Sequence, residues 1–121
     1  MVSPWLQRKV WHYAARLRNI KQYPAAVVGA EHSHLTEIAR SSKAPVLPLV
    51  ARLRERLEIL GRIDSRVNGN YLGRCAEVRA SNKILVNRPS VKVKDIDFTE
   101  AIRPRTMQFV KTCDNCRQTF R

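Results

Sequence analysis

The chain has 121 residues, 44% of them hydrophobic, and this length and composition suit a single compact domain over residues 1–121. Its formal net charge of +13 favours a polyanionic partner, of which nucleic acid is the commonest. No apolar run approaches the roughly 20 residues that a membrane span needs, and the N-terminus lacks the apolar stretch of a signal peptide, so we expect no membrane partner.

The first predicted element is a helix that begins at Ser3 and Pro4, which are typical of a helix start. Apolar residues then recur at spacings of three and four: Leu6, Val10, Tyr13, Leu17 and Ile20. Trp5 and Trp11 on this helix could stack on bases, although aromatic residues on an amphipathic helix more often serve packing.

A β-hairpin is expected next, because Pro24 interrupts helical structure. Residues 25–29 form a valine-rich run and residues 35–39 alternate between apolar and polar, so each segment predicts a strand. Residues 31–34 predict the turn between the two strands, and a loop follows at 41–43.

A second helix is predicted over residues 47–60, with Pro48 in its first turn and Gly61 as its stop signal. Its apolar positions again step by three and four: Val46, Val50, Leu53, Leu57 and Leu60. The glycine- and asparagine-rich residues 68–73 predict a flexible stretch.

The second half of the chain predicts two more helices around a strand. A third helix is expected over residues 75–86, and a central strand is expected within 91–110, with 98–102 as a candidate. Cys113 is expected to open a last helix that runs toward the C-terminus.

All three cysteines fall into two motifs, Cys75-Ala76-Glu77 and Cys113-Asp114-Asn115-Cys116. The odd number of cysteines argues against a disulfide framework. Zinc binds thiolates well, and catalytic zinc sites use three protein ligands and keep a fourth position open. Cys113 and Cys116, three residues apart at a helix start, can grip one ion from the same side. We therefore predict a Zn²⁺ cofactor held by Cys75, Cys113 and Cys116.

Glu77 follows Cys75 by two residues, so it can lie beside the metal without binding it. A carboxylate in that place can act as a catalytic proton carrier. The plainer interpretation is a glutamate favoured by the dipole at a helix N-terminus. Three thiolates on Zn²⁺ leave a net charge of minus one, and the helix termini and Arg74 are the candidates to compensate it.

Two other interpretations of the cysteines remain open. A lone Cys-x-x-Cys can be redox-active. Alternatively, His32 or His34 could complete a structural zinc site in a basic nucleic-acid-binding module, such as a ribosomal or regulatory component.

The motifs Gly73-Arg74-Cys75-Ala76-Glu77, Asn82-Lys83 and Cys113-Asp114-Asn115-Cys116 resemble the deaminase domains of bacterial polymorphic toxins. The most similar variety is the YwqJ-like group, whose first motif is Cys-Ala-Glu instead of His-Ala-Glu. One departure is Thr112, which stands where the family usually has a proline before the second motif.

This resemblance implies an α/β protein with the three-layer α/β/α cytidine deaminase-like fold and a small central sheet. It implies zinc-dependent hydrolytic deamination of cytosine to uracil in nucleic acid, for which single-stranded DNA or RNA is the expected substrate. It also implies a secreted effector domain that acts in the target-cell cytoplasm and has a cognate immunity protein as partner.

Three residues that precede the first motif are candidates for substrate binding: Asn68, Asn70 and Arg74. Ordinary loop chemistry explains these residue types equally well.

Overall fold

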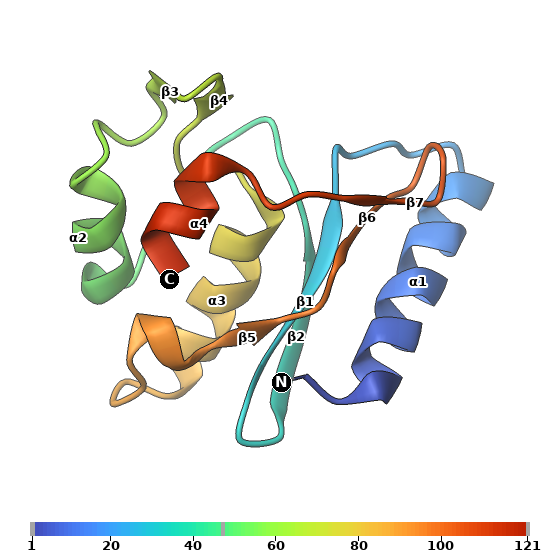
Figure 1. The fold of residues 1–121 in the computed structure, drawn as a ribbon, viewed down its shortest axis with the longest axis horizontal. Coiled ribbons are helices and arrows are strands. Elements are labelled where there is room, and N and C mark those ends of the chain that lie inside the picture. The colour runs from blue at the N-terminus through green and yellow to red at the C-terminus, as the bar shows by residue number, and fades with distance from the viewer. Residues whose placement is uncertain (1, 47, 121) are drawn as a thin grey trace.

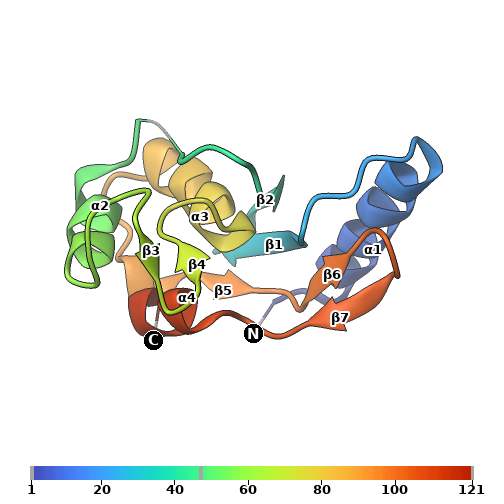
Figure 2. The ribbon, with the colours of Figure 1, turned by 90° about the horizontal axis from the view of Figure 1, so that it is seen from above.

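A small antiparallel sheet lies between two layers of helices (Figure 1). The computed structural model describes residues 2–46 and 48–120. The helices are α1 (Pro4–Asn19), α2 (Ala51–Glu58), α3 (Ala76–Asn87) and α4 (Asp114–Phe120). Seen from above, α1 lies on one side of the sheet and the other three helices lie on the opposite side (Figure 2). The predicted α/β class with a small sheet is confirmed.

The main sheet contains five strands among the described residues. They are β1 (Val27–His32), β2 (Leu35–Arg40), β5 (Asp97–Phe98), β6 (Ala101–Arg103) and β7 (Gln108–Val110). The order is β2-β1-β6-β7, β5 also pairs with β1, and every pairing is antiparallel. β1 is therefore the central strand: it pairs with β2 along one side and with β5 and β6 along the other, and β7 lies outside β6.

The predicted hairpin of β1 and β2 is present, but its boundaries differ from the prediction. β1 begins at Val27 and continues to His32, so the turn consists only of Ser33 and His34. Both turn residues have positive φ, 44° and 72°. Two consecutive left-handed residues match the twist of the flanking strands, which permits the short connection.

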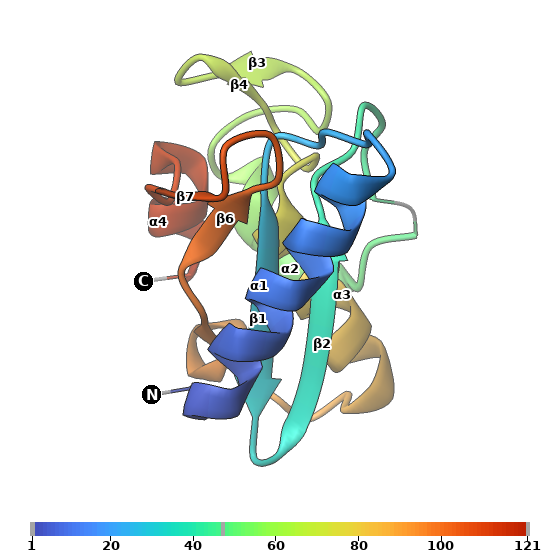
Figure 3. The same ribbon diagram turned by 90° about the vertical axis from the view of Figure 1, so that its right-hand side faces the viewer.

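α1 packs across β1 and β6 with the predicted apolar face (Figure 3). Leu6, Val10 and Leu17 are buried, whereas Ile20 is 61% exposed because the helix ends one residue before it. Gly29 in β1 makes this close approach possible. A Cβ there would lie 2.9 Å from Val10 Cγ2 and 3.0 Å from Leu6 Cγ.

α3 covers the other face of the sheet and lies at the centre of the larger hydrophobic core. Its small residues Ala76 and Ala80 are buried, as are Ile84 and Leu85 further along. Small side chains allow the helix to approach β1 and β2 closely. Its observed start at Ala76, with Cys75 as N-cap, is close to the predicted one.

α2 is shorter than the predicted helix over 47–60. Leu47 lies outside the described residues, and Pro48 lies in a bend before the helix. The cause is a buried side chain on α3. The Asn82 Oδ1 accepts a hydrogen bond from the Val50 N–H at 2.8 Å, and its Nδ2 donates to the Pro48 carbonyl at 3.1 Å. These bonds hold the approach to α2 in a non-helical conformation.

The stretch 68–73, predicted to be flexible, begins inside a second small sheet. β3 (Arg66–Val67) and β4 (Asn70–Tyr71) pair as an antiparallel hairpin. Asn68 and Gly69 form its turn with φ of 50° and 81°. An Asn-Gly pair with two positive φ angles is the preferred two-residue hairpin turn, so the signal was present in the sequence.

The strand predicted within 91–110 is broken into shorter pieces. A 3₁₀ turn covers Val93–Asp95, and β5 and β6 are separated at Thr99 and Glu100. At this break the Gly29 N–H donates to Thr99 Oγ1 at 2.9 Å, and the Thr99 N–H donates to the Gly29 carbonyl at 2.9 Å. These two bonds keep the interrupted strand attached to β1.

No helix within the described ranges is long and apolar enough to cross a membrane.

Candidate metal centre and basic cleft

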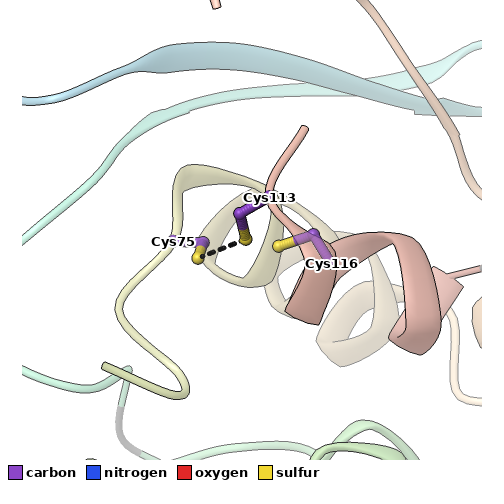
Figure 4. Close-up of side chains that lie close together, drawn as sticks. All are labelled: Cys75, Cys113 and Cys116. Carbon is purple, nitrogen blue, oxygen red and sulfur yellow. Dashed lines mark hydrogen bonds between the residues drawn. The ribbon is translucent and has the colours of Figure 1, made fainter. Parts of the chain in front are cut away.

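The three cysteines meet where two helices begin (Figure 4). Cys75 is the N-cap residue of α3, Cys113 directly precedes α4, and Cys116 lies in the first turn of α4. The Sγ atoms of Cys75 and Cys113 are 3.5 Å apart, and all three sulfur atoms lie within 4.8 Å of one another. All three thiols are free. The two motifs that were separate in sequence therefore form one cluster.

This cluster has the dimensions of a metal site. Zinc–sulfur bonds are about 2.3 Å long, so thiolates around a tetrahedral ion lie about 3.8 Å apart. The sulfur–sulfur distance is 3.5 Å for Cys75 and Cys113 and at most 4.8 Å for the other pairs. Small rotations of the cysteine side chains would bring these distances to the value for a bound ion. The ligand atoms that converge here are three sulfurs, and no histidine or carboxylate of the described residues joins them. The three cysteines can hold a metal ion and leave one coordination position open.

The three thiols shift one another's pKa values in opposite directions. The pKa of Cys113 is lowered by side-chain hydrogen bonding with Cys116 and Cys75 and by hydrogen bonds from the backbone N–H groups of Cys116 and Asn115. The hydrogen bond between Cys75 and Cys113 raises the pKa of Cys75 to about 12, and the bond to Cys113 also raises that of Cys116. A bound cation would need the sulfurs as thiolates, so metal binding would release protons from the cluster.

Glu77 lies in the first turn of α3 and is only 7% exposed. Burial raises the pKa of its carboxyl, its own backbone N–H opposes that effect, and the charge of Cys113 raises the pKa further. The Glu77 carboxylate is not among the converging ligand atoms. It is thus a buried acid beside the sulfur cluster.

A cavity of about 630 Å³ opens onto this cluster, and we call it the basic cleft. Cys75, Cys113 and Glu77 line it. Its walls come from the α1–β1 connection, the segment after β2, the β4–α3 segment, β6 and the β7–α4 link. Four basic residues line it: Lys43, Arg74, Arg103 and Lys111. Glu77 is the one acidic residue among its described lining residues, so the cleft suits an anionic ligand.

A second cavity, of about 680 Å³, reaches the cluster from the other side through Cys116. Glu77 and Lys111 line both cavities, so they lie between them. The second cavity carries Asp97 and Glu100 as well as Lys94, and its charge is therefore mixed. On charge, the basic cleft is the better site for a polyanion.

Of the three residues predicted to bind substrate, two line the cleft and one does not. Asn70 and Arg74 line the cleft, whereas Asn68 is not among its lining residues. The Asn68 Nδ2 instead donates a hydrogen bond to Asn115 Oδ1 at 3.0 Å. The Arg74 Nε donates to Asp64 Oδ1 at 2.5 Å, and this pairing offsets the charge that was expected to compensate the thiolates.

Sequence reasoning missed Asn115, which lies inside the second cysteine motif. Its buried amide accepts the bond from Asn68 and donates to the Val67 carbonyl at 2.9 Å. Asn115 thereby fixes the β3–β4 hairpin, one wall of the cleft, to the helix that carries two of the cysteines. No sequence signal marks that role, because the partners are 47 and 48 residues away.

The histidines lie at the wrong end of the molecule for the structural zinc interpretation. The Arg88 Nη1 donates to the His32 carbonyl at 2.7 Å, so His32 lies beside the C-terminal end of α3. Cys75 lies at the N-terminal end, and the 12 residues of α3 span about 18 Å. His34 follows in the turn between β1 and β2, at the end of the hairpin that carries His32.

No family model matches the chain, and neither curated proteins nor solved structures give a match. Its function is therefore inferred from its motifs, its fold and its cleft.

Proposed function

We propose that this protein is a zinc-dependent deaminase that converts cytosine to uracil in nucleic acid. The observation that carries the proposal is the convergence of three sulfurs from two helix starts, with buried Glu77 beside them, on one basic cleft. Helices on both faces of a small sheet support a cytidine deaminase-like fold as part of the same proposal.

The donor set fits zinc. Three thiolates and one open position match a catalytic site, whereas a closed structural site would need a fourth protein ligand. Cys75, Cys113 and Cys116 would hold the ion, and a bound Zn²⁺ would supply Lewis acidity and a nucleophile at neutral pH. The N-termini of α3 and α4 direct their partial positive charge at the cluster, which stabilises thiolates there.

Glu77 is the group that would move protons. Its carboxylate would take a proton from the attacking water and deliver protons to the ring nitrogen and to the departing amine. In the overall reaction water adds at C4 of cytosine, the bond between C4 and its amino nitrogen breaks, and ammonia leaves. Glu77 is only 7% exposed, so its carboxyl group is largely shielded from bulk water.

Nucleic acid is the proposed substrate because of charge. The chain carries a net charge of +13, and four basic residues line the cleft beside a single acid. A cytosine must leave its stack before it can enter a cleft of this kind. Single-stranded DNA or RNA is therefore the preferred form, because it does not require the duplex to be opened.

The resemblance of the two cysteine motifs to polymorphic-toxin deaminases supports a biological setting. In it, the protein is a secreted effector domain that acts in the cytoplasm of a target cell. A cognate immunity protein would neutralise it, and the surplus of basic residues would favour an acidic one.

The test is to incubate the purified protein with single-stranded DNA, duplex DNA and RNA of one sequence and to sequence the products for C-to-T changes. We expect faster conversion on single strands than on the perfect duplex. The Glu77→Ala variant should lose activity by about 10²-fold to 10⁴-fold and keep its metal. Glu55→Ala, which changes an exposed glutamate of α2, should match the wild type.

Absence of conversion on all three substrates by zinc-loaded wild-type protein would refute the proposal. Loss of metal in Glu77→Ala would make Glu77 a ligand, and full activity in this variant would remove it from the mechanism.

A further inference from the structure

We propose that the nucleic-acid strand crosses the basic cleft between two arginine-stacked tyrosines, Tyr23 and Tyr71, whose rings bind the bases on either side of the target cytosine. This inference rests on the proposed function and names the contacts that would bind its substrate. It differs from the sequence-based prediction, which placed substrate contacts at Asn68, Asn70 and Arg74.

The two tyrosines come from separate segments that face each other across the cleft. Tyr23 belongs to the α1–β1 connection, and Tyr71 belongs to β4. Both line the basic cleft, and both remain exposed, at 44% and 45%. The α1–β1 connection and the β3–β4 hairpin lie on opposite sides of the start of α3 in both views (Figures 1 and 2). A strand that delivers one base to Glu77 would thus pass between the two rings.

Each tyrosine has a guanidinium stacked on its ring. Arg105 Cζ lies 4.8 Å from the centroid of the Tyr23 ring, and Arg74 Cζ lies 4.1 Å from that of Tyr71. A stacked guanidinium holds an exposed ring in place. Less conformational entropy of the tyrosine side chain is then lost when a base stacks on it. Stacking between an aromatic ring and a base is tolerant of sequence, because every base has a π-face.

The two walls differ in charge, which predicts where the phosphates lie. Arg74 on the Tyr71 wall is paired with Asp64, so its charge is offset. Arg105 lies in the β6–β7 turn beside Arg103, and Lys111 follows β7 in the same hairpin. The strand backbone is therefore expected along the Tyr23 wall, with the Tyr71 wall contributing mainly stacking.

The chain offers a matched control in Trp11. It is 46% exposed, as the two tyrosines are, but it lies on α1, does not line the cleft and packs edge-on against His12. Nonspecific stacking of bases on exposed aromatic rings would involve Trp11 as much as the tyrosines. A strand bound in the cleft would not involve it.

The experiment measures binding of fluorescein-labelled oligodeoxycytidylate and oligocytidylate by anisotropy, in a zinc-loaded Glu77→Gln background that does not consume the ligand. Tyr23→Ala and Tyr71→Ala should each weaken binding by roughly 5-fold to 150-fold. Tyr→Phe at either position should retain binding, because the ring is kept, whereas Tyr→Leu should not. Trp11→Ala should stay within about twofold of the parent.

Salt titration tests the placement of the phosphates. Arg105→Gln should reduce the slope of log affinity against log salt by about 0.7. The charge-neutral pair Arg74→Gln with Asp64→Asn should leave the slope unchanged. The opposite pattern would overturn the placement of the backbone along the Tyr23 wall.

The outcomes separate this inference from the proposed function. Tyrosine variants that bind as tightly as the parent, while the wild type deaminates single strands, would overturn the tyrosine contacts and leave the enzyme proposal standing. Loss of binding in the tyrosine variants, with no deamination by the wild type, would support the contacts and refute the enzyme. Equal losses in Trp11→Ala and the tyrosine variants would also overturn the cleft contacts.

Discussion

Asn82 joins two elements through a single buried amide. It accepts the Val50 N–H and donates to the Pro48 carbonyl, and it is only 7% exposed. Asn82→Ala would leave both backbone groups without this partner, so the free energy of unfolding should fall by about 1–3 kcal/mol in urea titrations. Asn87→Ala is the control on the same helix, because Asn87 is exposed and bonds only within α3. Equal losses in the two variants would show that the amide does not hold the approach to α2.

Single residues were predictable where a motif fixes them at a helix start. Cys75 and Cys113 fall at the beginning of α3 and α4, so the convergence of the three sulfurs could be expected from spacing. The roles of Asn68 and Asn115 could not be predicted, because their hydrogen bond joins segments 47 residues apart. Nothing in the local sequence distinguishes an amide that binds substrate from one that binds another amide.

At the scale of elements, the packing of α1 on β1 depends on the absence of a side chain at Gly29. Gly29→Ala would place a Cβ 2.9 Å from Val10 Cγ2 and 3.1 Å from Thr99 Cγ2. We expect a loss of about 1–3 kcal/mol in the free energy of unfolding, because α1 must shift away from the sheet.

The control for this change is a double-mutant cycle with Val10→Ala. Removing the Val10 methyl groups opens the space that the new Cβ needs, so the double variant should lose less stability than the sum of the single variants. Strictly additive losses would show that the close approach at Gly29 is not what limits the packing.

Element boundaries were less predictable than element types. The apolar spacing continues through Val46 and Val50, but the chain enters α2 only at Ala51, because Asn82 holds the preceding backbone in another conformation. The Asn68-Gly69 pair carried a hairpin signal, but the flanking strands of two residues each are too short for alternation to reveal them.

At the scale of the whole molecule, part of the surplus positive charge lies on residues that line the cleft. Four basic residues line it, and one of them, Arg74, is offset by Asp64. For single-stranded nucleic acid the slope of log affinity against log salt should then be about −2 to −3 from the cleft alone. Fluorescence anisotropy across a salt series measures it. Affinity that does not change between low and physiological salt would show that the charge serves another partner.

The cleft itself could not be predicted from the sequence. Net charge indicated a polyanionic ligand, but Tyr23, Arg103 and Lys111 lie on segments whose meeting depends on the strand order β1-β6-β7. Short, irregular strands after residue 91 hide that order. The cysteine motifs predict the proposed chemistry. Only the fold places the proposed substrate-binding surface beside those cysteines.

The most direct test of a zinc-dependent cytosine deaminase is to remove the metal from the wild-type protein, return it, and follow conversion of cytosine to uracil in a single-stranded oligonucleotide. Near-ultraviolet circular dichroism checks that the metal-free chain stays folded. We predict that chelation abolishes conversion and that activity returns as zinc is added, with saturation at about one ion per chain. Undiminished conversion by metal-free protein, or no conversion by protein carrying one zinc ion per chain, would contradict the proposed activity.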